Sequence, residues 1–213
     1  MRLSINVPED LSEITLEQWQ NFVKLEEPTD YDVLRCFYGI DTKGVFEMKA
    51  NDVSRLVNHI SQLLNDKPKE LITSFKLSNL NFGFMPKLDD MTYGENTDLT
   101  KYSRDPKEAN KFMAVIYRPI VSEQFGKYNI EEYKGSSEYS ELMKQAPLSA
   151  YLSAQVFFWN LTNDLLNYIP IYLKEESQHL TAESGESMQA LLNSLEINLR
   201  ELTELQKRMF ISV

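Results

Sequence analysis

Residues 148–166, LSAYLSAQVFFWNLTNDLL, form the most apolar stretch of the chain. Pro147 marks the start of this stretch, and its apolar residues recur with the spacing of a helix. One broad face carries Leu148, Leu152, Phe158, Trp159, Leu165 and Leu166, and it is widened by Val156, Phe157 and Leu161. A helix that is apolar around most of its circumference normally lies at the centre of its domain. The stretch therefore predicts a core helix.

The same stretch does not fit a membrane span. A span needs about 20 predominantly apolar residues with very few polar groups. This stretch carries many of them, namely Ser149, Ser153, Gln155, Asn160, Thr162, Asn163 and Asp164. The first ten residues also lack the apolar run of a signal peptide. We therefore expect no membrane partner.

Composition and charge narrow the class of protein. The 213 residues suit one domain, or a domain with a small helical appendage, and eleven Tyr and eleven Phe argue against global disorder. The net charge of -10 repels nucleic acid, whose binding relies on Lys and Arg, and leaves a basic protein surface as a possible partner. The single cysteine, Cys36, excludes an intrachain disulfide and fits a reducing, intracellular setting.

The first 67 residues predict a small unit of three helices. Thr15 and Gln18 have the spacing of a capping box at the start of a helix over residues 16–25. Asp30 can cap a second helix, which Gly39 ends. Asn51 can begin a third helix with regular apolar spacing.

Residues 68–173 predict the core of the protein. A hairpin is expected over residues 74–85, because Phe and Leu alternate with polar residues on both sides of Ser78-Asn79. The polar segment 87–102 is expected to be a structured loop. A helix beginning at Asp105-Pro106 must end before Pro119, and residues 127–133 suggest a second short extended pair. The fold class expected is therefore mainly α, with one or two short β-hairpins.

The C-terminal part predicts a linker and an amphipathic helix. Residues 174–187 are polar and are interpreted as a linker, and residues 188–213 as the helix. Its apolar seam is a candidate partner-binding surface and consists of Met188, Leu191, Leu195, Asn198, Leu202, Leu205 and Met209. The seam could pack on the protein's own core or on another subunit. The four segments, residues 1–67, 68–173, 174–187 and 188–213, could also form a single domain.

The sequence shows no catalytic, cofactor-binding or metal-binding motif. The glycines do not form a phosphate loop, and His59 and His179 lack partners at ligand spacing. Four acids gather between residues 89 and 98, but their spacing does not match a calcium loop, and they are Asp89, Asp90, Glu95 and Asp98. We therefore expect no cofactor.

Arg118 is the charge of greatest interest. It follows an apolar helical run and precedes Pro119, so it lies where a buried helix ends. A cation at this place complements the helix dipole and can pair with an acid from residues 89–98. We interpret Arg118 as a structural charge. The alternative is a ligand-binding or enzymatic pocket built from Arg118 and those acids, which predicts a concave site joining them.

Five segments in fixed order resemble a family of phage proteins. They are ITLEQWQNF, NFGFMPKLDDMTYGENTDL, FMAVIYRPI, YNIEEYKGSSEYSELM and APLSAYLSAQVFFWNL, and the resemblance covers most of residues 10–170. The group resembled is encoded among the structural and tail genes of tailed bacteriophages, including crAss-like phages and other phages of Bacteroidetes hosts.

The resemblance implies a non-enzymatic morphogenesis protein that acts through protein–protein contacts. Its expected role is tail assembly chaperone or virion component, and the alternative is a head–tail connector or a packaged cargo protein. The implied partners are tail or connector proteins and other copies of the chain. The implied location is the host cytoplasm during assembly and, for a virion component, the particle.

Overall fold

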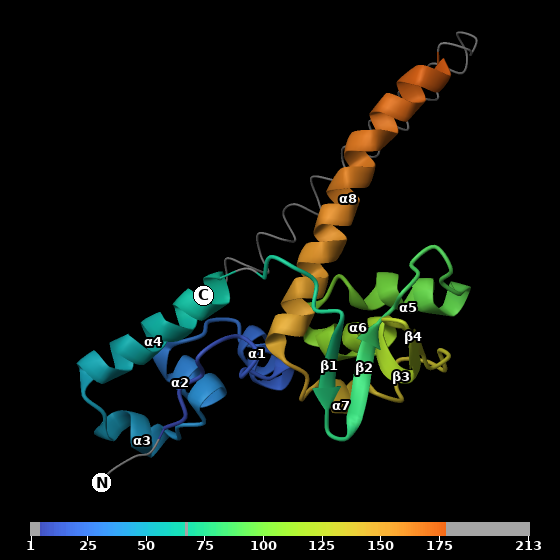
Figure 1. Cartoon of the computed structure of the whole chain (residues 1–213). Helices are drawn as coiled ribbons and strands as arrows, with labels where there is room; N and C mark the ends of the chain where they lie inside the picture. Colours follow the sequence, from blue (N-terminus) through green and yellow to red (C-terminus); the bar gives the residue numbers. More distant parts are fainter. Residues whose placement is uncertain (1–4, 67, 178–213) are drawn as a thin grey trace. The chain divides into compact units, whose positions relative to one another are not determined.

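The computed structural model describes residues 5–66 and 68–177 (Figure 1). The chain divides into two compact units, Met1–Ala154 and Gln155–Val213. The first unit contains a four-stranded antiparallel sheet and most of the helices. Only the stretch 155–177 of the second unit is described, and it is helical.

The fold is mixed α/β, and the expected mainly α class is wrong. Among confidently placed residues, 52% are helical and 14% lie in strands. The strands are β1 (Ser74–Leu77), β2 (Leu80–Phe84), β3 (Tyr117–Gln124) and β4 (Lys127–Ile130). Alternation predicted the 74–85 hairpin, and a short extended pair was expected within residues 127–133. The second hairpin instead joins β4 to β3, which begins at Tyr117. Strand β2 also pairs with β3, through Phe82 and Pro119, Gly83 and Arg118, and Phe84 and Tyr117. Pairing between segments so far apart leaves no local signature in a sequence.

The described part of residues 1–67 holds four helices and not the expected three, and capping side chains begin some of them but not α4. They are α1 (Leu16–Val23), α2 (Asp30–Tyr38), α3 (Thr42–Glu47) and α4 (Ala50–Asn65). The capping box at α1 is confirmed, because Thr15 Oγ1 accepts from Gln18 N at 3.3 Å and Gln18 Oε1 accepts from Thr15 N at 2.8 Å. Gly39 ends α2 in the left-handed conformation, as expected. The N-cap of α2 is Thr29, one residue before the expected Asp30.

Four further helices and a 3-10 turn follow in the described part of the chain. They are α5 (Tyr93–Tyr102), the 3-10 turn η1 (Pro106–Glu108), α6 (Ala109–Ile116), α7 (Ser140–Met143) and α8 (Leu148–Ser177). The segment expected to be a loop, 87–102, thus contains α5. Helix α6 supplies the centre of the core, since nearly all of its side chains are buried.

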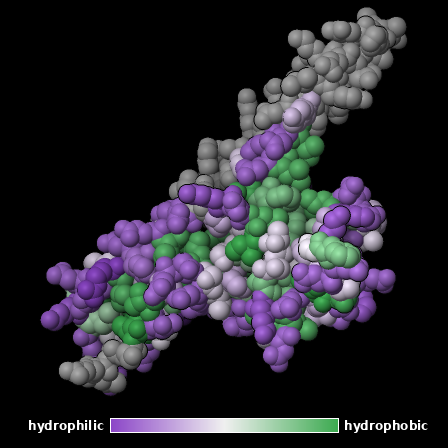
Figure 2. Space-filling view, in the orientation of Figure 1, coloured by the Kyte–Doolittle hydropathy of each residue, from purple (hydrophilic) through white to green (hydrophobic). Residues whose placement is uncertain are grey.

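Helix α8 contributes to the core only over its first two turns. Residues 148–154 are mostly buried, and the Tyr151 ring lies 5.0 Å from the Trp19 ring and 5.9 Å from the Phe112 ring. After Ala154 the helix becomes half-buried and then exposed, with Leu165 54% and Tyr168 71% exposed. Figure 2 shows apolar surface along α8. The expected core helix is therefore correct for its beginning and wrong for its second half, because periodicity identifies an apolar face but not what covers it.

The predicted linker begins too early. Helix α8 continues through Ser177, so residues 174–177 are helical. Lys and Glu favour helix interiors, which explains why a polar run can extend a helix. The rest of the linker and the predicted partner-binding seam, from Met188 to Met209, lie outside the described residues.

Candidate functional site

Glu95 is held in place by the start of α5. Thr92 Oγ1 accepts from Glu95 N at 3.2 Å, and Glu95 Oε2 accepts from Thr92 N and from the Thr92 hydroxyl, both at 2.7 Å. These bonds form a capping box, whose Thr-x-x-Glu spacing is visible in the sequence. The signal was missed because the segment is polar and lacks an apolar stripe.

Arg118 pairs with Glu95 inside the protein. Arg118 Nη2 lies 2.6 Å from Glu95 Oε1, and the two side chains are 7% and 6% exposed. Strand β3 places Arg118 directly opposite Gly83 of β2. Residues opposite each other in paired strands share one face of the sheet, so the Arg118 side chain leaves the sheet on the face where Gly83 has no side chain. The expected pairing of Arg118 with an acid of residues 89–98 is confirmed.

The surroundings keep the Glu95 carboxyl charged. Burial alone would raise the pKa of Glu95, but the hydrogen bonds from Thr92 and the Arg118 guanidinium outweigh it. The net result is a pKa below the ordinary value of a glutamate. A charged Glu95 is what a buried guanidinium needs, since an unpaired buried cation is strongly destabilising.

Tyr133 connects a second acid to this pair. The guanidinium carbon of Arg118 lies 5.5 Å from the centre of the Tyr133 ring, within cation–π distance. The Tyr133 hydroxyl donates to Asp98 Oδ2 at 2.5 Å, and burial together with this bond raises the pKa of Tyr133. The structure therefore brings together Glu95, Asp98 and Arg118 around one aromatic ring.

One edge of the guanidinium remains without an acceptor. Arg118 Nε is buried and makes no hydrogen bond among the described residues. Glu95 cannot complete a bidentate pair, because its second oxygen is already occupied by Thr92. Sequence reasoning could place Arg118 near an acid, but it could not see that the pair is monodentate.

A pocket of about 230 Å³ opens beside this ion pair. It joins Arg118 to Asp90 and Glu95, two of the four acids named in the ligand-binding alternative, whereas Asp89 and Asp98 are not among its lining residues. We call it the Met pocket, and its lining consists of Met85, Pro86, Lys87, Asp90, Met91, Glu95, Arg118, Asn129 and Ile130. Sequence analysis did not identify Met85, Met91 or Ile130 as part of any site.

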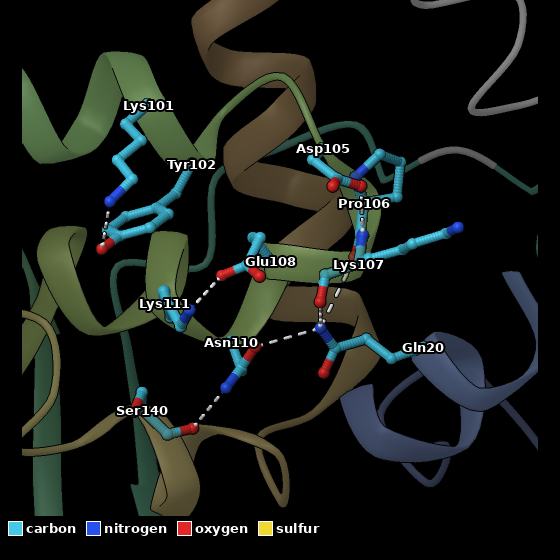
Figure 3. Close-up of polar contacts among 10 residues, drawn as sticks. All are labelled: Gln20, Lys101, Tyr102, Asp105, Pro106, Lys107, Glu108, Asn110, Lys111 and Ser140. Carbon is cyan, nitrogen blue, oxygen red and sulfur yellow. Dashed lines mark hydrogen bonds and ion pairs between the residues drawn. The ribbon is translucent and has the colours of Figure 1, made fainter. Parts of the chain in front are cut away.

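A second polar cluster lies in the interior and serves a different purpose (Figure 3). Gln20 Nε2 donates to Lys107 O at 2.9 Å and to Asn110 Oδ1 at 3.1 Å, and Asn110 Nδ2 donates to Ser140 O at 3.0 Å. Gln20, Asn110 and Ser140 are all buried. Because these groups satisfy one another across α1, α6 and α7, the cluster fixes the packing of the helices.

The other surface features that are described do not gather charged side chains around a pocket as the Arg118 site does. A hollow of about 460 Å³ follows the polar side of α4 and includes His59, whose Nε2 lies 2.8 Å from the Pro8 carbonyl oxygen. Within residues 5–66 and 68–177, no three His, Cys, Asp or Glu side chains gather as metal ligands would. No helix in this part of the chain has the length and apolar character needed to cross a membrane.

Comparisons of the chain with protein-family models, with curated proteins and with solved structures find no match.

Proposed function

We propose that the protein is a non-enzymatic morphogenesis protein of a tailed bacteriophage, acting through contacts with other proteins. Within this role it is a tail assembly chaperone or a component of the virion. The proposal draws on the resemblance of five ordered segments to proteins encoded among phage structural and tail genes. Its proposed partners are tail or connector proteins and other copies of the chain.

The observation that carries the proposal is the exposure of two large apolar side chains on α8, Leu165 and Tyr168. The sequence remains as apolar after Ala154 as before it, yet Leu165 and Tyr168 are more than half exposed. Elsewhere, Phe46, Tyr93 and Phe125 also expose most of their surfaces. Exposed apolar surface of this kind is typical of proteins that bind other proteins. The net charge of -10 favours a basic partner surface.

The test compares a phage that carries this gene with a derivative from which it is deleted. We expect the deletion to reduce the yield of complete particles without reducing genome replication, as counted by electron microscopy and quantitative PCR. Unchanged yield and infectivity would refute the proposal.

Quantitative mass spectrometry of gradient-purified particles then separates the two roles. A fixed copy number relative to the tail proteins indicates a virion component. Abundance in infected cells combined with absence from particles indicates an assembly factor that leaves before maturation.

The Met pocket favours a second candidate, a domain that binds a small ligand. It joins Arg118 to two carboxylates in one concave site. The test is a nuclear magnetic resonance screen of small carboxylate and amide fragments against the full chain. Shifts confined to the pocket residues support this candidate, and a screen without such shifts removes it.

A further inference from the structure

The buried cation of the Arg118–Glu95 pair keeps a donor that no group of its own chain satisfies. The Arg118 side chain is 7% exposed, and its Nε is buried without a hydrogen-bond acceptor among the described residues. A buried donor in this state destabilises a fold unless a partner from outside the chain supplies the acceptor. Because Arg118 lines the Met pocket, that acceptor is expected on a group bound in the pocket.

Two further charges on the wall of the pocket are also unpaired. Lys87 and Asp90 both line the Met pocket, and both side chains are exposed. They stand three positions apart, yet neither forms an ion pair or a hydrogen bond with any described residue. Glu131 and Lys134, which have the same spacing, do form an ion pair. The pocket thus offers an unpaired cation and an unpaired anion beside the Arg118 Nε.

The charges of the pocket favour a ligand that carries both signs. Lys87 and the Arg118 Nε attract a carboxylate, whereas Asp90 attracts an ammonium group. A multiply charged anion such as phosphate is disfavoured, because the carboxylates of Asp90 and Glu95 lie on the same pocket. A simple amine is disfavoured in turn by Lys87 and Arg118. A zwitterion complements the charges of both signs.

The rest of the pocket limits the size and the side chain of the ligand. Its volume of about 230 Å³ lies below the roughly 300–1,000 Å³ that is usual for drug-sized ligands, so the ligand must be small. Met85, Met91 and Ile130 belong to the apolar part of the lining, and methionine side chains adapt to irregular apolar groups. A short apolar side chain on the ligand therefore fits this part of the pocket.

We propose that the Met pocket binds a free α-amino acid with an apolar side chain. The carboxylate of the ligand accepts from Arg118 Nε and pairs with Lys87, and its ammonium group pairs with Asp90. Its side chain packs on Met85 and Met91. The proposal rests on the small-ligand candidate above and names the class of ligand that this site takes. It can be measured on the purified chain, so its failure would leave the phage test unaffected.

The experiment is a nuclear magnetic resonance titration of the isotopically labelled full chain with L-valine. We expect saturable shifts of backbone amides among the residues that line the pocket. Two analogues of the ligand are the controls, since N-acetyl-L-valine lacks the ammonium group and L-valinamide lacks the carboxylate. Each analogue loses charge-assisted hydrogen bonds and is expected to bind at least about tenfold more weakly than L-valine.

Variants of the two exposed charges test the contacts without disturbing the buried ion pair. Lys87→Gln and Asp90→Asn each remove one charge of the pocket, and each is expected to weaken the binding of L-valine by about two- to fivefold, as for a pair at an exposed site. Asp89→Asn is the matched control, because Asp89 is the exposed neighbour of Asp90 and does not line the pocket. Its affinity for L-valine should equal that of the wild type. All three side chains are exposed, so the variants are expected to fold, which thermal melting checks.

The outcomes separate this inference from the candidate on which it rests. Saturable binding of L-valine that both analogues fail to match supports the amino-acid site. An absence of saturable shifts with L-valine, or equally tight binding of N-acetyl-L-valine, would overturn it. Unchanged affinity in both Lys87→Gln and Asp90→Asn would overturn it as well. Pocket shifts caused by the screened fragments alone would keep the small-ligand candidate and overturn the amino-acid proposal.

Discussion

The two hairpins of the sheet have turns of the same length and similar backbone conformation, but different residues occupy them. Each has a two-residue turn whose first residue has a positive φ, +55° at Ser78 and +52° at Phe125. Because the four strands run up and down in order, both turns lie at the same end of the sheet. A small polar residue serves the first turn, whereas the second carries an exposed aromatic ring. The second turn therefore holds a bulky residue in the left-handed region without burying its ring.

The hairpins also differ in how they are attached to the rest of the protein. Strand β1 packs its Phe75 ring 5.9 Å from Phe82 and 5.0 Å from Tyr117. Strand β4 is held by Tyr128, whose hydroxyl donates to Phe84 O at 2.8 Å and to Thr73 O at 3.0 Å. Thus ring packing secures the first hairpin, while one tyrosine that crosses β3 secures the second.

The largest effect is expected at the junction of the two hairpins, where Arg118 pairs with Glu95. Arg118→Leu leaves the Glu95 carboxylate buried without its cation, and we expect a loss of about 3–5 kcal/mol of unfolding free energy. Urea denaturation measures this loss. The control is Arg35→Leu, because the Arg35–Asp32 pair is exposed and should contribute less than about 1 kcal/mol. Equal losses of unfolding free energy in both variants would contradict the claim that the buried Arg118–Glu95 pair stabilises the protein more than the Arg35–Asp32 pair.

The next effect concerns Gly83, over which Tyr128 passes. A Cβ at Gly83 would lie 2.5 Å from Tyr128 Cε2 and 2.9 Å from Ile120 Cγ1. We therefore expect Gly83→Ala to destabilise the protein by about 1–3 kcal/mol. Gly94→Ala is a control of opposite sign, because its Cβ meets Tyr133 at 3.9 Å and alanine favours the helix. Thermal melts of both variants measure these changes. A Gly83→Ala variant as stable as the wild type would refute the close passage of Tyr128 over Gly83.

A smaller effect is expected when only the tyrosine hydroxyl is removed. Tyr128→Phe keeps the ring over Gly83 but removes hydrogen bonds to two carbonyl groups, with an expected loss of about 1–2 kcal/mol. Amide exchange should accelerate in β4 more than in β1. The comparison of the two hairpins would fail if β1 were affected equally.

The pH dependence of stability provides a further test of the junction. Because the folded-state pKa of Glu95 is lowered, the charged carboxylate stabilises the protein fully above its ordinary pKa. This contribution disappears as the pH falls through the lowered folded-state value. Glu95→Gln should therefore flatten the acid side of the stability curve. Glu141→Gln, which alters a surface pair with Lys144, should leave that curve unchanged in shape.

The smallest effect is expected at the turns themselves. Phe125→Asn relieves an unfavourable conformation and should stabilise the protein by up to about 1 kcal/mol, because the left-handed region costs most L-residues about 1–2 kcal/mol and Asn adopts it more readily. Ser78→Asn should change stability less, because serine is already small and polar. Chemical denaturation at low protein concentration measures both. A destabilised Phe125→Asn monomer would show that the ring contributes to the fold of its own chain.

The parts of the fold predicted from sequence are those that local chemistry determines. Thr15 and Gln18 cap a helix through bonds between neighbours, and the 74–85 hairpin follows from alternation. The joining of β2 to β3 and the point at which α8 leaves the core depend on contacts between distant residues. The sequence therefore predicted the first hairpin but neither the β3–β4 hairpin nor the sheet.

The candidate site was predictable to a similar degree. The position of Arg118 before Pro119 predicted pairing with an acid, and the Thr92-x-x-Glu95 spacing would have identified both the helix and the residue. The Met pocket depends on three separate segments coming together, which no local pattern records. The conformation of Phe125 is likewise hidden, because its sequence gives no sign of a positive φ.

Hydrogen–deuterium exchange of the wild-type and Tyr128→Phe chains tests the central claim most directly. We expect residues 127–130 of β4 to exchange faster in the variant, while residues 74–77 of β1 exchange at the same rate as in the wild type, because ring packing holds β1 and the Tyr128 hydroxyl holds β4. Faster exchange in both strands, or in neither, would contradict the claim that the two hairpins are attached by different contacts.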